Sequence, residues 1–370
     1  MAIDPAGISG RRIALVLGTS TGGVGRHVRA LAVGLQNRGA QVTVCAPASV
    51  DEAFGFSGLG AGFVPVAIGK GWRFFDPRTV ARLRAAVGDV ELVHAHGLRP
   101  SIAATAARRG GQPLVITWHN AVLGSAVHRQ VLRRGERAVA RGSDLVLGAS
   151  QDLVDRARAL GARDARLTML PAPDLPPPSG ARAEIRDRLG IGSQVVVLTV
   201  ARLVPQKRLD VLVDAASLLA RAGVDVEVLI VGGGRLQLEL SEQIQRTGAP
   251  VRLLGERFDV GDLLVAADVF ALSSAWEARS FAVQEAMLRD CAVVVPRVGG
   301  LPELVGDSGV IVEPADAQAL ADGIRRLVDD PGQRAALATA AKTRAAGWPA
   351  ESTVIDETIA AYLGWIAPVR

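Results

Sequence analysis

The stretch IALVLGTSTGGVGRHVRALAVGLQNRG, residues 13–39, contains the structural unit that decides the fold. It begins with an apolar run of strand length over 13–17 and continues through a turn rich in glycine, serine and threonine. From about Arg26 to Asn37 the apolar residues have the spacing of an amphipathic helix, and Gly39 ends it. A wholly apolar strand followed directly by a helix is typical of a parallel sheet that helices cover on both faces.

This unit of strand and helix recurs along the chain. Further strand-like runs are QVTVCA (41–46), ELVHAH (91–96), PLVITWHN (113–120), DLVLGAS (144–150), VVVLTV (195–200), VEVLIVGGG (226–234), VRLLG (251–255), VFALSS (269–274), VVVP (293–296) and GVIVEP (309–314). The stretch PAPDLPPP (171–178) interrupts the pattern, because five prolines among eight residues can continue neither a helix nor a strand. We therefore predict two α/β domains, residues 1–172 and 191–351, with a linker over 173–190 between them and a last helix over 352–370.

The composition is that of a globular protein with room for two cores. Of the 370 residues, 49% are hydrophobic and 21% are charged. The net charge of +5 suits anionic ligands, whereas the lack of a long Lys/Arg run argues against a nucleic-acid partner. Two cysteines form no disulfide framework and fit a reducing compartment. No apolar segment reaches the roughly 18–20 residues of a spanning helix, so we expect a cytoplasmic protein, soluble or peripheral to a membrane.

The turn GTSTGGVGRHV (18–28) suits a phosphate, because its glycines let a ligand approach the backbone and the following helix offers free N–H groups. The pattern argues against a nicotinamide dehydrogenase, since Val28 stands where the third glycine of the dinucleotide motif belongs and no acid ends the next strand. A P-loop nucleotidase is excluded as well, since no GK[ST] follows the turn. An ordinary tight turn between strand and helix stays open as the alternative.

Two cations follow the strand at 195–200. Arg202 and Lys207 lie five positions apart directly after it, and open α/β sheets bind ligands at the carboxyl ends of their strands. Together the two side chains can converge on a diphosphate, although each alone is more typical of a solvated surface.

The stretch EARSFAVQEAM (277–287) places Glu277 in a loop, and the next helix is expected to begin near Ser280 as its N-cap. Phe281 and Glu285 then share one face of that helix. The N–H groups at the helix start suit a phosphate, Glu285 suits a ribose diol and Glu277 suits sugar hydroxyls. These residues predict a site for a sugar joined to a nucleoside diphosphate. In the alternative interpretation, Glu277 only stabilises the helix start and Glu285 is half exposed.

Five motifs in register resemble the retaining family 4 glycosyltransferases, which have the GT-B fold. The motifs are GGVGRHV (22–28), TWHN (117–120), ARLVPQK (201–207), the glutamates 277 and 285 with EAM at the second, and VGGLPELV (298–305). The resemblance covers nearly the whole chain. It implies two Rossmann-like domains facing each other across a central cleft. The nucleotide sugar is then held by the C-terminal domain and the acceptor mostly by the N-terminal domain, to which the last helix crosses back.

The resemblance also implies roles for single residues. Arg202 and Lys207 match the pair that neutralises the diphosphate, Glu285 matches the residue that binds the ribose hydroxyls, Glu277 matches the contact to the donor sugar, and His119 matches a histidine near the anomeric carbon. A glycine loop that closes on the diphosphate and backbone N–H groups at the helix start complete the set. The implied donor-binding residues are Gly22, Gly23, Arg202, Lys207, Ser280, Phe281 and Glu285, and the implied catalytic residues are His119, Arg202, Lys207 and Glu277.

The implied reaction moves mannose, glucose or N-acetylglucosamine from a nucleoside-diphosphate sugar to a hydroxyl of a lipid, polyol or glycan acceptor. The family works without a metal ion, and this sequence contains no DxD motif, so neither metal nor cofactor is expected. Retention of configuration then follows from a same-face displacement. The departing diphosphate helps to deprotonate the acceptor hydroxyl, and Arg202 and Lys207 stabilise its growing charge.

Some positions depart from the family pattern. Ser280 stands where the family usually has glycine or proline, and 288–292 lacks the usual small-x-Gly-x-Pro. Arg279 is an unusual charge beside the sugar site, expected to contact an anionic donor group or solvent, and Gly233 stands where many relatives carry an acid. Two alternatives therefore stay open, namely a degenerate homologue that binds nucleotide sugars without turnover and a sugar-nucleotide 2-epimerase. The base is expected to be chosen by backbone contacts near 252–256.

Three further histidines and one basic helix complete the candidate features. His94 and His96 flank a strand end, where an acceptor contact or a structural hydrogen bond is favoured over a metal, since no third ligand is near in sequence. His27, in the first helix, faces either the cleft or solvent.

The segment VHRQVLRRGERAVARG (127–142) predicts a basic amphipathic helix. Its arginines are Arg129, Arg133, Arg134, Arg137 and Arg141, most of them on one face. Such a face can lie on an anionic membrane surface, which would place the protein at the inner face of the plasma membrane. The alternative is the solvated face of an ordinary domain helix.

Overall fold

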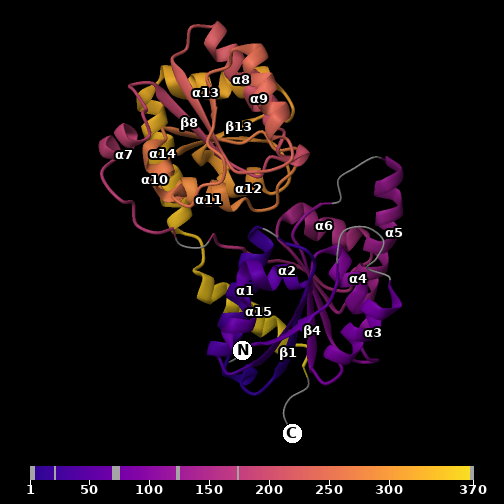
Figure 1. Cartoon of the computed structure of the whole chain (residues 1–370). Coiled ribbons are helices and arrows are strands. Elements are labelled where there is room, and N and C mark those ends of the chain that lie inside the picture. Colours follow the sequence, from indigo (N-terminus) through magenta and orange to yellow (C-terminus); the bar gives the residue numbers. More distant parts are fainter. Residues whose placement is uncertain (1–4, 21, 69–75, 122–125, 173–174, 367–370) are drawn as a thin grey trace. The chain divides into compact units, whose positions relative to one another are not determined.

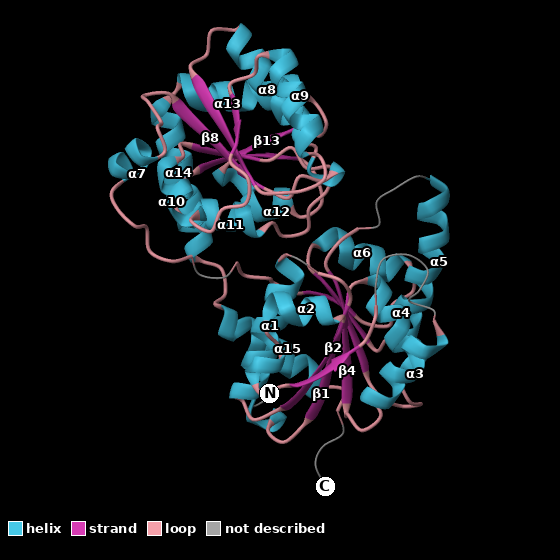
Figure 2. Ribbon diagram, viewed as in Figure 1, coloured by secondary structure: helices cyan, strands magenta, loops and turns pink. Residues whose placement is uncertain are grey.

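The chain forms two compact units in the computed structural model, which describes residues 5–20, 22–68, 76–121, 126–172 and 175–366. The first unit comprises Met1–Pro171 and Pro349–Arg370, and the second comprises Ala172–Trp348. Each unit contains one parallel sheet with helices on its faces (Figures 1 and 2). The prediction of two α/β domains built on parallel sheets is confirmed.

The first unit contains a seven-stranded sheet of order β3-β2-β1-β4-β5-β6-β7. Its strands are β1 (Arg12–Leu17), β2 (Gln41–Ala46), β3 (Gly62–Pro65), β4 (Leu92–His96), β5 (Leu114–Trp118), β6 (Leu145–Gly148) and β7 (Ala165–Leu167). Its described helices are η1 (Pro5–Ile8), α1 (Gly23–Asn37), α2 (Ala48–Phe54), η2 (Ser57–Leu59), α3 (Pro77–Ala86), α4 (Leu98–Ala107), α5 (Ala126–Gly142), α6 (Gln151–Ala159) and α15 (Glu351–Leu363). Strands β4 and β5 are buried along their whole length, as expected for apolar strands covered on both faces.

The last helix, α15, completes the core of the first unit by packing against α1 and η1 (Figure 1). Ile355, Ile359 and Tyr362 of α15 lie in the same buried cluster as the apolar residues of β1 and β2. The two helices approach closely at Gly34, where a Cβ atom would lie 2.4 Å from Cδ1 of Ile355. A side chain larger than hydrogen at position 34 would therefore push α15 away.

The second unit contains a six-stranded sheet of order β10-β9-β8-β11-β12-β13. Its strands are β8 (Val195–Val200), β9 (Val226–Val231), β10 (Val251–Leu253), β11 (Val269–Ala271), β12 (Ala292–Pro296) and β13 (Val310–Val312). Its helices are α7 (Arg182–Arg188), η4 (Pro205–Lys207), α8 (Leu209–Arg221), α9 (Gln237–Thr247), α10 (Val260–Ala266), α11 (Phe281–Leu288), α12 (Leu301–Val305), η5 (Gly306–Ser308), α13 (Ala317–Asp329) and α14 (Pro331–Ala346). Two buried clusters, one on each face of the sheet, form its core.

Helix α7 lies within 173–190, where the sequence predicts a linker. Ile185 of this helix is 1% exposed and belongs to a core cluster of the second unit. Arg182 and Arg186 both pair with Asp268, at 2.7 and 3.2 Å. The prolines prevent regular structure only as far as 178, and a single apolar residue flanked by arginines then suffices to anchor a short helix on the second unit.

Candidate active site

Two loops meet at the carboxyl ends of β8 and β11 in the second unit. Gln206, in the loop after β8, accepts a hydrogen bond at its backbone oxygen from the Ala275 N–H at 2.8 Å. Its side-chain amide donates to the Trp276 carbonyl at 2.9 Å. The Ser273 hydroxyl donates to the Lys207 carbonyl at 2.9 Å. These bonds tie together the two loops that carry the predicted donor-binding residues.

Lys207 and Glu277 form an ion pair across these loops. The two side chains are only 16% and 10% exposed, so the pair is poorly hydrated and its attraction is weakly screened. The structure thus brings together two residues for which the sequence suggests separate partners, a diphosphate for Lys207 and a sugar for Glu277.

Arg202, in contrast, has an exposed side chain. Within the part of the chain that the structure describes, this side chain makes no hydrogen bond or ion pair. Among the described residues, Arg202 is therefore a cation without a counter-charge, whereas the charge of Lys207 is balanced by Glu277.

The backbone of Glu277 is held by the glycine pair of VGGLPELV. The Gly300 N–H donates to the Glu277 carbonyl at 3.0 Å. Gly299 has a φ of 51°, and a Cβ atom there would lie 1.9 Å from that carbonyl oxygen. Position 299 therefore requires glycine, both for its backbone conformation and for the approach of the Glu277 loop.

Helix α11 begins at Phe281 with Ser280 as its N-cap residue, at the position that the sequence predicts. The Ser280 side chain makes no capping hydrogen bond. Glu285, one turn into the helix, is 6% exposed, so the interpretation of Glu285 as half exposed is wrong. Glu277, taken as a whole residue, is 8% exposed. Burying two carboxylates at one end of a sheet is unfavourable unless polar partners compensate, and such placement is typical of a functional site.

Arg279 has an aromatic partner that the sequence does not indicate. Its guanidinium lies over the ring of Trp348, 4.8 Å from the ring centroid. Burial lowers the pKa of Arg279 to about 10, with Glu303 opposing this shift and Arg344 adding to it. Stacking on an aromatic face explains how this cation is accommodated in the second unit, and sequence reasoning missed it because Trp348 is remote in the chain.

A carboxylate also lies next to Gly233, where many relatives carry an acid. A Cβ atom at Gly233 would lie 2.7 Å from Oε1 of Glu256. Because Gly233 has no side chain, Glu256 can occupy the space beside it. The acidic group at this edge of the sheet therefore comes from the loop after β10.

In the first unit, four histidines gather at the carboxyl ends of β4 and β5. His94 and His96 lie two positions apart on β4 and so share a face, with ring centroids 4.0 Å apart. His96 Nδ1 and His119 Nε2 are 3.2 Å apart and hydrogen bonded. The ring of His27, from α1, packs edge-on against both His96 and His119, with centroids 5.7 and 5.6 Å away.

His94 makes structural hydrogen bonds, which is one of the two alternatives that the sequence leaves open for it. Its Nδ1 bonds the Tyr362 hydroxyl at 2.6 Å and its Nε2 bonds the Thr117 hydroxyl at 2.7 Å. Tyr362 is the single tyrosine of the chain and is fully buried, and burial raises the pKa of its hydroxyl well above the ordinary value. Its role escaped sequence reasoning because α15 and β4 are separated by most of the chain.

Burial favours the neutral form of each of these four histidines. Burial lowers the pKa of His27 to about 4. Burial, and then the charge of His27, lower the pKa of His94 to about 3. Burial and the neighbouring histidines hold the pKa of His96 and of His119 well below the ordinary value. The cluster therefore offers neutral imidazoles, which can donate or accept hydrogen bonds without adding charge.

The glycines of the first turn have different surroundings. Gly22 is the N-cap residue of α1, and nothing lies within 4 Å of the place of its missing Cβ. Gly23 is the first residue of the helix and is exposed. Gly25 is required by packing, since a Cβ atom there would lie 2.2 Å from the ring of Phe54. The space beside Gly22 is therefore free of described atoms, whereas Gly25 packs against Phe54.

Comparisons with known proteins identify the family to which the chain belongs. Residues 22–173 match the family described as "Glycosyl transferase 4-like domain", and residues 181–344 match "Glycosyl transferases group 1". The chain is 34% identical over 316 residues to D-inositol 3-phosphate glycosyltransferase 1 of Catenulispora acidiphila, covering 77% of this chain and 74% of the relative. It is 29% identical to a GDP-mannose-dependent alpha-(1-6)-phosphatidylinositol monomannoside mannosyltransferase of Mycolicibacterium smegmatis, over 72% of this chain and 75% of that one.

Solved structures of the same fold include Anabaena Alr3699/HepE in complex with UDP. That structure is 26% identical, has a TM-score of 0.79, and is matched over 96% of this chain and 99% of the other. The chain therefore belongs to the group 1 glycosyltransferases, family 4 with the GT-B fold, which are enzymes that transfer a sugar from a nucleotide-sugar donor.

Proposed function

We propose that this protein is a retaining hexosyltransferase that moves mannose, glucose or N-acetylglucosamine from a nucleoside-diphosphate sugar to an acceptor hydroxyl without a metal ion. The observation that carries the proposal is the arrangement of Arg202, Lys207 and Glu277 at the carboxyl ends of β8 and β11. It combines an unpaired cation for a diphosphate with a buried carboxylate for sugar hydroxyls. A relative named as GDP-mannose-dependent and a similar structure solved with UDP-glucose support a hexosyl donor of this kind.

We infer the role of each donor-binding group from the charges at the site. Arg202 neutralises negative charge on the diphosphate. The N–H groups at Ser280 and Phe281 add the partial positive charge of the α11 helix start. Lys207 binds a phosphate oxygen while it keeps its contact with Glu277. Glu285 accepts hydrogen bonds from the ribose hydroxyls. In the first unit, the backbone of Gly22 and Gly23 contacts the diphosphate and His119 contacts the reacting sugar.

The reaction balances without a protein base. The bond between the anomeric carbon and the diphosphate oxygen breaks, and the acceptor oxygen bonds to the same face of that carbon. The acceptor's proton passes to the departing phosphate oxygen, and Arg202 and Lys207 stabilise the negative charge that remains. Glu277 and Glu285 then hold the donor and form no covalent intermediate.

The direct test is transfer in the presence of a chelator. The protein is incubated with UDP-, GDP- and ADP-hexoses with and without polyol and lipid acceptors, and the anomeric configuration of any product is read by NMR. Retained configuration is expected. Glu277→Ala should lower transfer while nucleotide binding persists, and Glu285→Ala should weaken nucleotide binding. Full transfer by Glu277→Ala would defeat its assigned role.

Two other outcomes separate the alternatives. Nucleotide-sugar binding without any product across the donor and acceptor panel would indicate a degenerate binding homologue. Release of a C2-epimerised sugar without an acceptor would indicate a 2-epimerase. Either outcome would overturn the transferase proposal.

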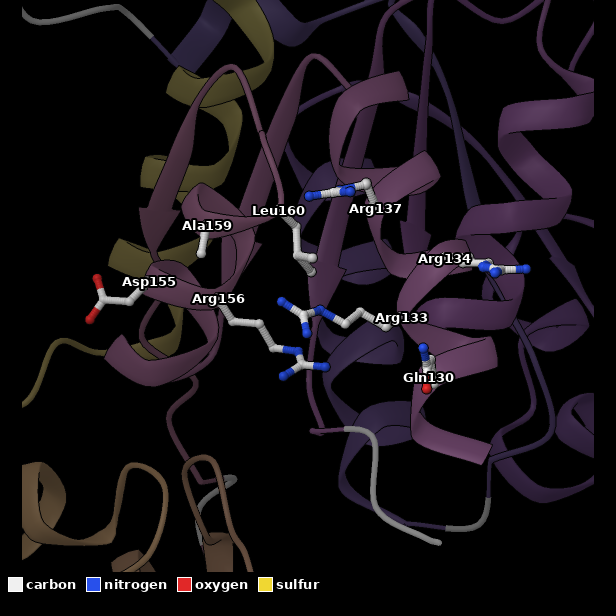
Figure 3. A pocket seen from close by; sticks show the side chains of 8 residues that line it. All are labelled: Gln130, Arg133, Arg134, Arg137, Asp155, Arg156, Ala159 and Leu160. Atoms are coloured by element: carbon white, nitrogen blue, oxygen red, sulfur yellow. The ribbon is translucent and has the colours of Figure 1, made fainter. Parts of the chain in front are cut away.

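For the acceptor, we propose a hydroxyl compound that carries a phosphate, bound by arginines of α5. A groove of about 1000 Å³ between α5 and α6 is lined by Gln130, Arg133, Arg134, Arg137, Asp155, Arg156, Ala159 and Leu160 (Figure 3). The guanidinium groups of Arg133 and Arg156 face each other across it, whereas Arg134 points away. Arg156 pairs with the buried Glu136 through two hydrogen bonds, at 2.9 and 2.6 Å. An anion between facing guanidinium groups would relieve their repulsion.

The same arginines bear on the membrane prediction. Arg133, Arg134, Arg137 and Arg141 are exposed, as a helix lying on anionic lipid requires, while the side chain of Arg129 lies outside the described residues. Among the described helices, none is long and apolar enough to cross a membrane. One relative is named for D-inositol 3-phosphate and another for a phosphatidylinositol monomannoside, and either compound would present a phosphate to this groove.

Vesicle binding distinguishes the two sources of phosphate. Binding to vesicles with anionic lipid at low salt, and none to neutral vesicles, is expected if α5 lies on the membrane. Binding of inositol phosphate, with no vesicle binding, would indicate a soluble acceptor. Arg133→Glu with Arg137→Glu should abolish either result, while Arg82→Glu, an exposed arginine on α3, should leave it unchanged. Equal binding to neutral and anionic vesicles would contradict the membrane prediction.

A further inference from the structure

The hydrogen bond between His96 and His119 determines which nitrogen of His119 can face a substrate. The two rings are 3% and 7% exposed, and their pKa values are held well below the ordinary value, so both are neutral. A neutral imidazole has one N–H and one bare nitrogen. Across the 3.2 Å contact between His96 Nδ1 and His119 Nε2, only one of the two nitrogens therefore carries the proton.

The other nitrogen of His96 decides between the two arrangements. Among the described residues, His96 Nε2 is a buried atom with no hydrogen-bond partner. If His119 were the donor, the proton of His96 would lie on this Nε2 as a buried N–H without an acceptor. In protein backbones, orphaned buried N–H groups are rarer than under-satisfied carbonyl groups, and we apply the same preference to the imidazole. The favoured arrangement therefore has the proton of His96 on Nδ1, donated to His119 Nε2, and the proton of His119 on Nδ1.

We propose that His96 is a positioning residue that fixes His119 in the Nδ1–H tautomer, so that His119 meets the substrate as a hydrogen-bond donor and not as a base. This inference rests on the proposed function, in which His119 contacts the reacting sugar. It also fits the proton balance of that reaction, because the acceptor's proton leaves with the diphosphate and no protein base is required. A neutral donor can hold a sugar or acceptor oxygen over a wide pH range.

A chain of contacts from the last helix holds His96 in place. The His94 ring lies 4.0 Å from the His96 ring between centroids. Both nitrogens of His94 are engaged, by Tyr362 of α15 at 2.6 Å and by Thr117 of β5 at 2.7 Å. The orientation of His119 therefore depends, through His96 and His94, on a hydroxyl at the far end of the chain. Tyr362 is a second positioning residue in this account.

NMR tests the tautomer directly. The chain has five histidines, so long-range ¹⁵N–¹H spectra of histidine-labelled protein can be assigned with single substitutions. The His119 signals should show the Nδ1–H tautomer and should not titrate between pH 6 and 8. His96→Asn should preserve this tautomer, because the Asn amide can donate from the place of Nδ1. An Nε2–H tautomer of His119 in the wild type, or a His119 that titrates near pH 6.5, would overturn the inference.

Kinetics provide the second readout. His96→Leu should lower kcat by about 10- to 100-fold with the donor KM unchanged, as expected when a contact group is misplaced rather than removed from binding. His96→Asn should recover most of that loss. Tyr362→Phe should reduce kcat in the same direction, whereas Thr358→Val should not, since the Thr358 hydroxyl of the same helix bonds only the Val354 carbonyl among the described residues.

Failure of the inference and failure of the proposed function give different results. A wild-type rate in His96→Leu, or a His96→Asn variant no better than His96→Leu, would overturn the positioning role while glycosyl transfer stands. A wild-type protein that transfers no sugar would defeat the proposed function, and the NMR experiment would still decide the tautomer.

Discussion

Lys207 and Glu277 lie 70 residues apart in the sequence and form an ion pair in which neither side chain is more than 16% exposed. The pair joins the loop after β8 to the loop after β11, and the backbones of both loops are hydrogen bonded beside it. Because Glu277 balances Lys207, Arg202 is a cation at this edge whose charge no described residue compensates.

Glu277→Gln should lower both transfer and stability. The substitution keeps the volume of the side chain but leaves the ammonium of Lys207 largely buried without its partner. We expect a loss of about 2 kcal/mol in the free energy of unfolding and about 100-fold in kcat. Glu313→Gln is the control, because Glu313 is 67% exposed and its pair with Arg297 should contribute less than about 1 kcal/mol. Wild-type kcat in Glu277→Gln, measured beside this control, would contradict the assignment.

Arg202→Ala should weaken nucleotide binding without affecting the fold. The Arg202 side chain is exposed and makes no described hydrogen bond or ion pair, so its removal should leave the thermal midpoint unchanged. A charge-assisted bond to a diphosphate is worth about 1.5–3 kcal/mol, so the dissociation constant of the nucleotide should rise about 10- to 100-fold. Arg221→Ala, an exposed arginine in the last turn of α8, should leave calorimetric titrations unchanged. Equal affinity in both variants would refute the role of Arg202.

Gly299→Ala should destabilise the second unit and displace Glu277. The added methyl would meet the Glu277 carbonyl at 1.9 Å in a backbone conformation, φ 51°, that alanine adopts at a cost. We expect a loss of about 1–3 kcal/mol in unfolding free energy together with a lower kcat. Gly223→Ala separates the two effects, because Gly223 has a φ of 71° with nothing within 4 Å of its missing Cβ. Equal thermal stability of Gly299→Ala and Gly223→Ala would show that the close contact at position 299 does not contribute to the free energy of unfolding.

Stability of the first unit should fall in mild acid. The folded pKa values of His27 and His94, about 4 and about 3, lie below the unfolded value, so the folded state binds fewer protons than the unfolded chain. Stability is therefore full above about pH 6.5 and is lost as the pH falls toward 4, by up to about 1.4 kcal/mol per pH unit for each histidine. Scanning calorimetry at pH 7, 6 and 5 measures this slope. His27→Gln should reduce it, and identical slopes in variant and wild type would disprove the contribution of His27.

The parallel sheets could be predicted because their strands are short, wholly apolar runs, such as 195–200, that alternate with helices. The start of α11 at Phe281 could be predicted from Ser280 and the apolar spacing after it. Helix α7 could not, since the nearby prolines conceal the single apolar anchor, Ile185. The spacing of apolar residues therefore predicts elements whose structure is determined by residues close to one another in the sequence.

Contacts between distant segments were beyond prediction from the sequence. Nothing near Lys207 indicates Glu277 as its partner, and nothing near His94 indicates Tyr362, 268 residues away. Arg279 likewise gains Trp348 only in the folded unit. The family resemblance supplied the roles of the donor-binding residues, and those roles stay predictions until the variants above are measured.

The most direct test of nucleotide-sugar chemistry is thermal unfolding with UDP, GDP, ADP and dTDP, each with a chelator and no metal. A nucleotide at about 100 times its dissociation constant stabilises the folded state by about 2.7 kcal/mol, which corresponds to about 3 °C or more. The account predicts that at least one nucleotide produces this shift and that Arg202→Ala and Glu285→Ala reduce it. No shift with any of the four nucleotides would contradict the assignment of the β8 and β11 loops as a donor site.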